Sequence, residues 1–175
     1  MLPGNSITMF WIIVFSYWIH LISTVVWFGA LLVIVLAAGP AFRQGATEGN
    51  DWLAAQKKLL PWANLSLVLL LVTGFAQMTN DPNYNGFLAI DGVWAWAMLL
   101  KHIAYALLVG AMAYMQFGLF PAFDRVEMLR EKRPSLAQSE QEKLARQEKR
   151  LLWVNIICAA VILLCTAVAT AVGVV

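Results

Sequence analysis

Charged residues are scarce in this sequence. They make up 13% of its 175 residues, whereas 61% are hydrophobic, and the formal net charge is only +2. A soluble globular domain is roughly 25% charged and 45–50% apolar. Together with a mean hydropathy of +0.72, this composition excludes a separate water-soluble domain and indicates an integral membrane protein.

Several chemical signatures are missing as well. All ten Asp and Glu residues lie in loops or at helix ends, which disfavours a proton-driven carrier that relies on a carboxylate within the membrane. The chain has no Gly-rich phosphate loop, no Ser, His and Asp set for nucleophilic catalysis and no CxxC motif. Nucleic-acid binding is not indicated, because the basic segment at 121–150 is typical of a solvated helix face that lies against anionic lipid.

Cysteine is limited to Cys158 and Cys165. Both lie in the last apolar segment, where a separation of seven residues corresponds to about 10.5 Å of helix rise. This distance is too long for a mutual disulfide. We interpret the two thiols as small apolar packing residues, with a pair of soft-metal ligands as the alternative.

Long hydrophobic runs are what the sequence does contain. Four of them, at 7–38, 59–78, 93–120 and 151–175, reach the length of about 20 residues that a helix needs to cross a bilayer. We therefore predict an all-α, polytopic membrane protein, with a single domain over 1–175 and four transmembrane helices in a bundle.

Prolines and turn formers predict where these helices begin and end. The Gly-Pro pair at 39–40 and the Phe-Pro pair at 120–121 are expected to end the first and third helices. Ser139 followed by Glu142 has the pattern of a capping box. This pattern predicts that an extension of the fourth helix begins there.

Lys and Arg residues are distributed unevenly among the loops. The first loop, 39–58, carries three of the twelve and the third, 121–150, carries eight, whereas the second, 79–92, has none. Basic loops stay on the cytoplasmic side of a membrane, so the first and third loops are predicted to be cytoplasmic and both termini to lie outside. We expect a protein of the bacterial inner membrane without a cleaved signal peptide.

The two halves of the chain repeat one another. Matching short sequences are Gly-Ala at 29–30 and 110–111, Pro-Ala-Phe at 40–42 and 121–123, and Trp-x-Asn at 62–64 and 153–155. We predict a duplicated two-helix hairpin, with repeats at about 7–78 and 93–175. Because each repeat crosses the membrane an even number of times, the copies have the same orientation, as in parallel transporter repeats.

Lys101 and the two histidines, His20 and His102, lie inside apolar segments. An ionisable group in hydrocarbon costs a few kcal/mol, so it tends to persist where it has a partner or a function. Under the predicted duplication His20 and Lys101 are equivalent, and both histidines lie roughly 14–19 Å below the same membrane surface. We therefore expect the three groups to meet at one level near the axis of the bundle.

Two imidazoles at equal depth on parallel helices can ligate a b-type haem from opposite sides. Small residues beside His20 and His102 favour this interpretation because they leave room for a flat ligand. Lys101 is predicted to pair with a haem propionate or a substrate carboxylate, or to replace His102 as the second ligand.

Copper is the alternative cargo, because imidazole and thioether groups also bind it. Met98 lies one helical turn before His102, so His20, His102 and Met98 are the candidate copper ligands. A third hypothesis is a structural or assembly subunit in which the histidines only bond helices together. Asn64, Asn155, Gln116 and Thr73 are interpreted in that structural way.

Two stretches carry a family resemblance. Residues 18–30, with their Trp-Ile-His and Trp-Phe-Gly-Ala sequences, and Pro-Ala-Phe at 40–42 resemble the first helix of the copper-resistance D family and of the HemJ-type protoporphyrinogen oxidases. Residues 96–101 are similar to a Trp-to-Lys segment in a later helix of both. The HemJ resemblance implies a haem b site at His20 and Lys101, and the other implies copper uptake or handling. The basic loop and His102 depart from the HemJ pattern, which weakens protoporphyrinogen oxidation but not haem binding.

From these patterns we predict a membrane b-type haem protein with a redox role, in electron transfer or in oxidation of a lipophilic substrate. Whether it is an enzyme stays open. The expected partners are membrane lipid and a lipophilic substrate or redox partner, with a homo-oligomer left open. The sequence names neither the substrate nor the electron partner, and it does not choose between His102 and Lys101 as second ligand.

Overall fold

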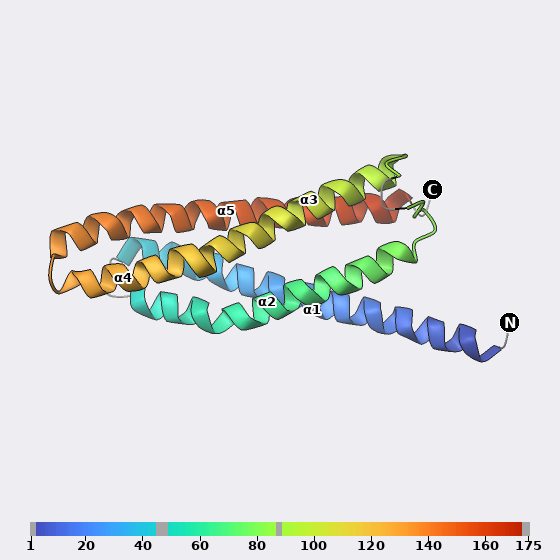
Figure 1. Ribbon diagram of the computed structural model, residues 1–175, viewed down its shortest axis with the longest axis horizontal. Coiled ribbons are helices and arrows are strands. Elements are labelled where there is room, and N and C mark those ends of the chain that lie inside the picture. The colour runs from blue at the N-terminus through green and yellow to red at the C-terminus, as the bar shows by residue number, and fades with distance from the viewer. Residues whose placement is uncertain (1–2, 45–48, 87–88, 173–175) are drawn as a thin grey trace. The chain divides into compact units, whose positions relative to one another are not determined.

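The structure is a computed structural model that describes residues 3–44, 49–86 and 89–172. Within these ranges every regular element is helical, which confirms the all-α prediction. The elements are α1 (Pro3–Gln44), α2 (Gly49–Thr79), α3 (Val93–Tyr114), the π-helical turn η1 (Met115–Leu119), α4 (Phe120–Arg130) and α5 (Pro134–Val172) (Figure 1).

Among the described residues, four helical stretches are long and apolar enough to span a membrane, as predicted. They are Ile7–Leu36, Gln56–Thr79, Val93–Arg130 and Pro134–Val172. In none of them is more than 33% of the most apolar window buried within the chain. Soluble proteins rarely expose so much apolar surface to water. We therefore treat these helices as membrane-spanning and lipid as their surroundings.

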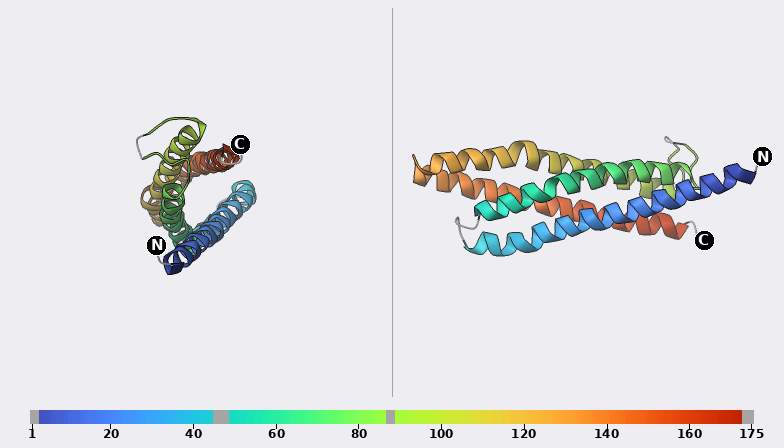
Figure 2. Two further views of the ribbon diagram at one scale, coloured as in Figure 1. Left: turned by 90° about the vertical axis from the view of Figure 1, so that its right-hand side faces the viewer. Right: turned by 90° about the horizontal axis from the view of Figure 1, so that it is seen from below.

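The chain divides into two compact units, Met1–Phe87 and Leu88–Val175. In unit 1, α1 packs along α2; in unit 2, α3 and α4 pack along α5 (Figure 2). The division falls between the two predicted repeats, and each unit is a helical hairpin of the kind the repeat predicts. The duplication itself stays a prediction, and so does the single domain over 1–175.

Unit 1 is held together by a stripe of apolar side chains on α1. Trp27, Ala30, Leu31 and Ile34 are buried, and their spacing places them on one face of a helix. Ala63, on α2, is buried as well. A small side chain at such a position lets the two helix backbones approach closely.

Unit 2 has a core that combines small and large side chains. Leu108 of α3 and Leu119 of η1 are each only 1% exposed. On α5, Cys158, Ala159 and Cys165 are buried, and both cysteines are free thiols. Their burial agrees with the interpretation as apolar packing residues.

Two predicted helix ends are wrong because a proline does not end the helix there. α1 continues past Pro40 to Gln44; one proline removes a single hydrogen bond, and helices near a membrane tolerate this loss. The third helix does not end at 120–121 either. The backbone N–H of Phe120 bonds the carbonyl of Met115 in the π-helical turn, so Pro121 falls in the first turn of α4, where no N–H is needed.

The predicted start of the fourth helix is also wrong. α5 begins at Pro134, so Ser139 and Glu142 lie inside it and do not cap it. Proline has no backbone N–H and a fixed φ, and both properties suit the first position of a helix. This signal takes precedence over the capping-box pattern five residues later.

Candidate functional site

His20 is anchored to α2 through Thr73. The Nδ1 atom of His20 lies 2.8 Å from Thr73 Oγ1, and that oxygen lies 2.6 Å from the carbonyl oxygen of Leu69. The threonine hydroxyl has one hydrogen, which it donates to the carbonyl, so its oxygen accepts from the Nδ1–H of His20. A neutral His20 therefore carries its lone pair on Nε2.

The ring of His20 also lies beside Gly74 of α2. The Cε1 atom of His20 would lie 3.5 Å from a Cβ placed on Gly74, which is ordinary van der Waals contact. One turn further along α1, the hydroxyl of Thr24 donates to the carbonyl of His20 at 2.8 Å. The imidazole thus lies against α2 beside Gly74, with its Nδ1 edge hydrogen-bonded to Thr73.

Two more polar side chains, Ser16 and Gln77, lie in this hairpin one helical turn from His20 and from Thr73. Gln77, one turn after Thr73, donates from Nε2 to the backbone carbonyl of Ser16 at 3.4 Å. The Ser16 Oγ atom is buried and has no hydrogen-bond partner. A buried hydroxyl left in this state costs about 1–3 kcal/mol, so Ser16 supplies a hydrogen-bonding group that is available to a ligand near His20.

His102 is oriented within α3. Its Nδ1 atom lies 2.6 Å from the backbone carbonyl oxygen of Met98. A carbonyl can only accept, so Nδ1 carries a hydrogen and a neutral His102 has its lone pair on Nε2. His20 and His102 therefore share one tautomer, in which the ring N–H is held by a fixed oxygen. Metal-bound histidines are oriented in this way.

Lys101 and Trp94 lie on the same helix as His102. Lys101 is half-buried and lies near Cys165 of α5. Successive side chains on a helix point about 100° apart, so Lys101 and His102 leave α3 in different directions. The indole Nε1–H of Trp94, two turns before His102, is buried and has no hydrogen-bond acceptor.

The predicted site residues are divided between the two units. His20 belongs to unit 1, whereas Met98, Lys101 and His102 belong to unit 2. Their convergence at one level therefore stays a prediction. Within the part of the chain that the structure describes, no group of three or more His, Cys, Asp or Glu side chains is placed to hold a metal ion. This finding concerns metal ions held by three or more such side chains. It does not test a haem, whose iron needs only two ligands from the protein.

Two residues of the site were missed as site residues in the sequence. The sequence predicts for Thr73 only that it bonds helices together. Its bond to His20 confirms that role and adds a second one, the orientation of the ring. For Gln77 the sequence predicts no role. The available signal was the spacing: Thr73 and Gln77 are four residues apart, like Ser16 and His20, so each pair lies on one face of its helix.

Comparisons of this chain with protein-family models, curated proteins and solved structures find no match. The function is therefore argued from the residues themselves. The resemblance of residues 18–42 and 96–101 to the copper-resistance D and HemJ-type families stays a prediction.

Proposed function

We propose that this protein binds one b-type haem in the membrane, with the Nε2 atoms of His20 and His102 as axial ligands. The observation that carries the proposal is the shared tautomer: the Nδ1–H of His20 is held by Thr73, and that of His102 by the Met98 carbonyl. Each ring then offers Nε2 as its ligand nitrogen in a fixed direction, which lowers the entropic cost of ligation.

The buried donors fit a ligand with carboxylate groups. The Ser16 hydroxyl lies one turn from His20 along α1, and the Trp94 indole N–H lies two turns from His102 along α3; both are buried and unpaired. Haem propionates accept hydrogen bonds from groups of this type. The Lys101 ammonium adds a positive charge on α3 that would balance a propionate.

Each protein residue would have a defined task in this site. His20 and His102 hold the cofactor, while Thr73 and the Met98 carbonyl fix the ring planes. The apolar side chains of the membrane spans exclude water and so lower the local dielectric constant. This environment would shift the redox potential of a bound haem. When bound, haem b supplies one-electron transfer, and the proposed role is electron transfer or oxidation of a lipophilic substrate.

The proposed location follows from charge. The four apolar helices support an integral membrane protein. Applying the positive-inside rule to the eleven Lys and Arg residues at 39–58 and 121–150 puts these loops in the cytoplasm and both termini outside. We propose the bacterial inner membrane, where a lipid-soluble electron carrier would reach the site from the bilayer.

A second candidate function is copper handling, and the position of Met98 favours it. Met98 and His102 are four residues apart on α3, a spacing that places two side chains on one face of a helix. A thioether and an imidazole on one face suit Cu(I). His20 would be the third ligand in this alternative.

Metal analysis of the purified, full-length protein separates the two candidates. The haem proposal predicts close to one iron per chain, an absorption spectrum with a Soret band and no stoichiometric copper. The copper alternative predicts copper without a haem spectrum, and a loss of that copper in both His20→Ala and Met98→Leu. A protein from haem-replete cells with neither metal would leave only a structural role for the histidines.

A further inference from the structure

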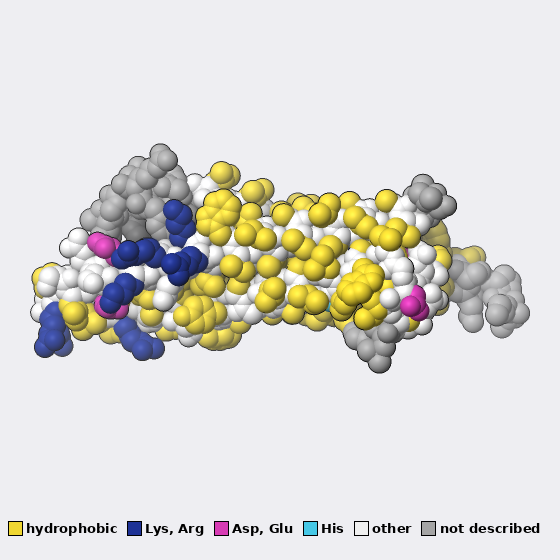
Figure 3. Space-filling model, turned by 90° about the horizontal axis from the view of Figure 1, so that it is seen from above, with side chains coloured by type: hydrophobic (Ala, Val, Ile, Leu, Met, Phe, Trp, Pro, Cys, Tyr) yellow, Lys and Arg dark blue, Asp and Glu magenta, His cyan; other side chains and the backbone are white. Residues whose placement is uncertain are grey.

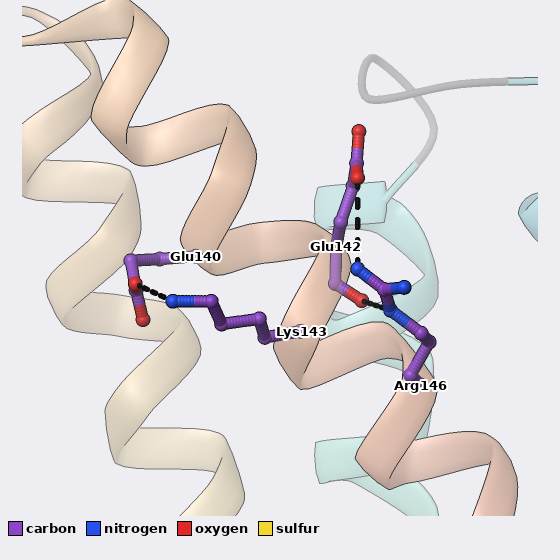
Figure 4. Close-up of polar contacts among 4 residues, drawn as sticks. All are labelled: Glu140, Glu142, Lys143 and Arg146. Atoms are coloured by element: carbon purple, nitrogen blue, oxygen red, sulfur yellow. Dashed lines mark hydrogen bonds and ion pairs between the residues drawn. The ribbon is translucent and has the colours of Figure 1, made fainter.

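One end of α5 carries two kinds of cation that differ in their partners. Lys143 lies 2.6 Å from Glu140, and Arg146 lies 3.8 Å from Glu142 (Figure 4). These pairs neutralise both cations within the helix. They are exposed, so they contribute little to stability, but they leave no net charge to attract an anion.

Lys149 and Arg150 are different. Both are exposed, and within the described part of the chain neither forms an ion pair or a side-chain hydrogen bond. They are the last two charged residues of α5 before its apolar stretch. On the face drawn in Figure 3, Lys and Arg side chains gather at one end, beside the surface covered by hydrophobic side chains.

Trp153 completes the arrangement. This residue is 57% exposed and lies three and four residues after Arg150 and Lys149, so it neighbours each of them on the helix surface. The two cations leave the helix about 100° apart, and their long, flexible side chains can bend toward the tryptophan that lies next to both. An exposed tryptophan at the end of a membrane span sits at the level of the lipid headgroups. The two cations then lie about one turn, roughly 5 Å, closer to water, where a lipid phosphate is found.

We propose that Lys149, Arg150 and Trp153 form a binding site for the headgroup of an anionic membrane phospholipid. The phosphate would be held between the lysine ammonium and the arginine guanidinium, and the tryptophan ring would lie against the glycerol and the first acyl carbons. A phospholipid with a net negative charge is preferred over a zwitterionic one, because no acidic residue in this cluster balances the choline or ethanolamine cation. This inference is independent of the proposed haem site.

Unit 1 carries a smaller version of the same arrangement. Lys58 and Trp62 of α2 are both exposed, and they are four residues apart, like Lys149 and Trp153. Lys58 also forms no ion pair within the described ranges. Leu59 stands where unit 2 has Arg150, so the unit 1 site has one cation fewer and is expected to bind the same lipid more weakly.

Native mass spectrometry of the full-length protein in detergent tests the proposal. Titration compares phosphatidylglycerol with phosphatidylcholine of the same acyl chains, and the wild type is expected to retain phosphatidylglycerol in preference. A basic residue near a lipid surface is worth about 1 kcal/mol, so K149Q/R150Q should lower the affinity for phosphatidylglycerol about 10- to 30-fold. The affinity for phosphatidylcholine should stay within about threefold, and K58Q should cost about three- to fivefold.

The matched control is K143Q/R146Q, which removes the same two charges from the same helix but takes them from cations that are already paired. It should change the affinity for phosphatidylglycerol less than threefold. All four positions are exposed, so helical circular dichroism should be unchanged. Equal losses in the two double variants, no preference for phosphatidylglycerol, or displacement of the lipid by equimolar inorganic phosphate would each overturn the proposal.

Discussion

The Thr73 hydroxyl oxygen accepts a hydrogen bond from the Nδ1–H of His20 across the α1–α2 hairpin, at 2.8 Å, and the hydroxyl donates to the Leu69 carbonyl at 2.6 Å. The carbonyl is the fixed end of this chain of two hydrogen bonds, because it belongs to the backbone of α2. The direction of both bonds follows from it, and so does the tautomer of His20. A side chain that the sequence marked only as a link between helices therefore determines which nitrogen His20 presents to a ligand.

Replacement of Thr73 by valine should weaken haem binding without removing the axial ligand. Valine keeps the shape of threonine but cannot accept the Nδ1–H, and loss of such a partner typically lowers metal affinity about 10- to 100-fold. Thr73→Ser retains the hydroxyl and should bind haem within about threefold of the wild type. Titration of the haem-depleted protein with hemin measures these affinities.

Thr166→Val is the control for this pair. The Thr166 hydroxyl also donates to a carbonyl of its own helix, that of Ile162 at 2.8 Å, but Thr166 is exposed and its hydroxyl bonds within α5 rather than to a histidine. It should leave the haem affinity unchanged. If Thr73→Val and Thr166→Val behaved alike, the hydrogen bond to His20 would have no part in ligand binding.

The tautomers can be measured without any cofactor. In apoprotein labelled with nitrogen-15 at histidine, above the pH at which imidazole is protonated, His20 and His102 should both show a protonated Nδ1 and an unprotonated Nε2. Thr73→Val should shift His20 toward a mixture of tautomers and leave His102 unchanged, because the Met98 carbonyl that holds it is intact. A wild-type His20 protonated at Nε2 would contradict the hydrogen-bond assignment even if haem binds.

Gly74 provides a steric test of where the His20 ring lies. A Cβ at this position would be 3.5 Å from Cε1 of His20, which is an ordinary contact distance, so Gly74→Ala should retain the haem spectrum. The longer side chain in Gly74→Leu extends into the space of the ring and should displace it. We expect that variant to lose most of its Soret absorbance, measured against total protein; an unchanged spectrum would show that the ring lies elsewhere.

Leu108 and Leu107 separate core packing from lipid contact. Leu108 is 1% exposed, whereas its neighbour Leu107 is 59% exposed. Leu108→Ala should lower the free energy of unfolding by about 2–5 kcal/mol, because it leaves a cavity between packed helices. Leu107→Ala should cost less than about 0.5 kcal/mol, since lipid can fill the space. Unfolding in mixed detergent measures both values, and equal losses would mean that unit 2 is not packed as described.

Hydrophobic length allowed the spans to be predicted from the sequence, and single prolines caused the errors in their ends. The apolar runs are long enough to leave no alternative to helices, because a backbone in lipid must satisfy its own hydrogen bonds. The same constraint makes α1 continue past Pro40 and favours the π-helical turn before Pro121. Proline is a strong helix terminator in water, and the rule transfers poorly to a helix that has no better partner for its backbone.

The candidate site could be predicted only in part. His20, Lys101 and His102 are conspicuous in the sequence because they are costly in hydrocarbon. The partners of the two histidines are not conspicuous. Thr73 is 53 residues from His20, and a contact over that distance depends on how α1 and α2 are rotated against each other. The bond between His102 and the Met98 carbonyl depends on a side-chain rotamer, which spacing alone does not determine.

Electron paramagnetic resonance of the oxidised, full-length protein, recorded beside its absorption spectrum, tests the central claim most directly. It reports whether a haem is present and which side chains ligate its iron. The account predicts a low-spin haem with two histidine ligands that is lost in His20→Ala and in His102→Ala and kept in Lys101→Ala. A colourless protein from haem-replete cells, or a haem that survives the loss of either histidine, would contradict it.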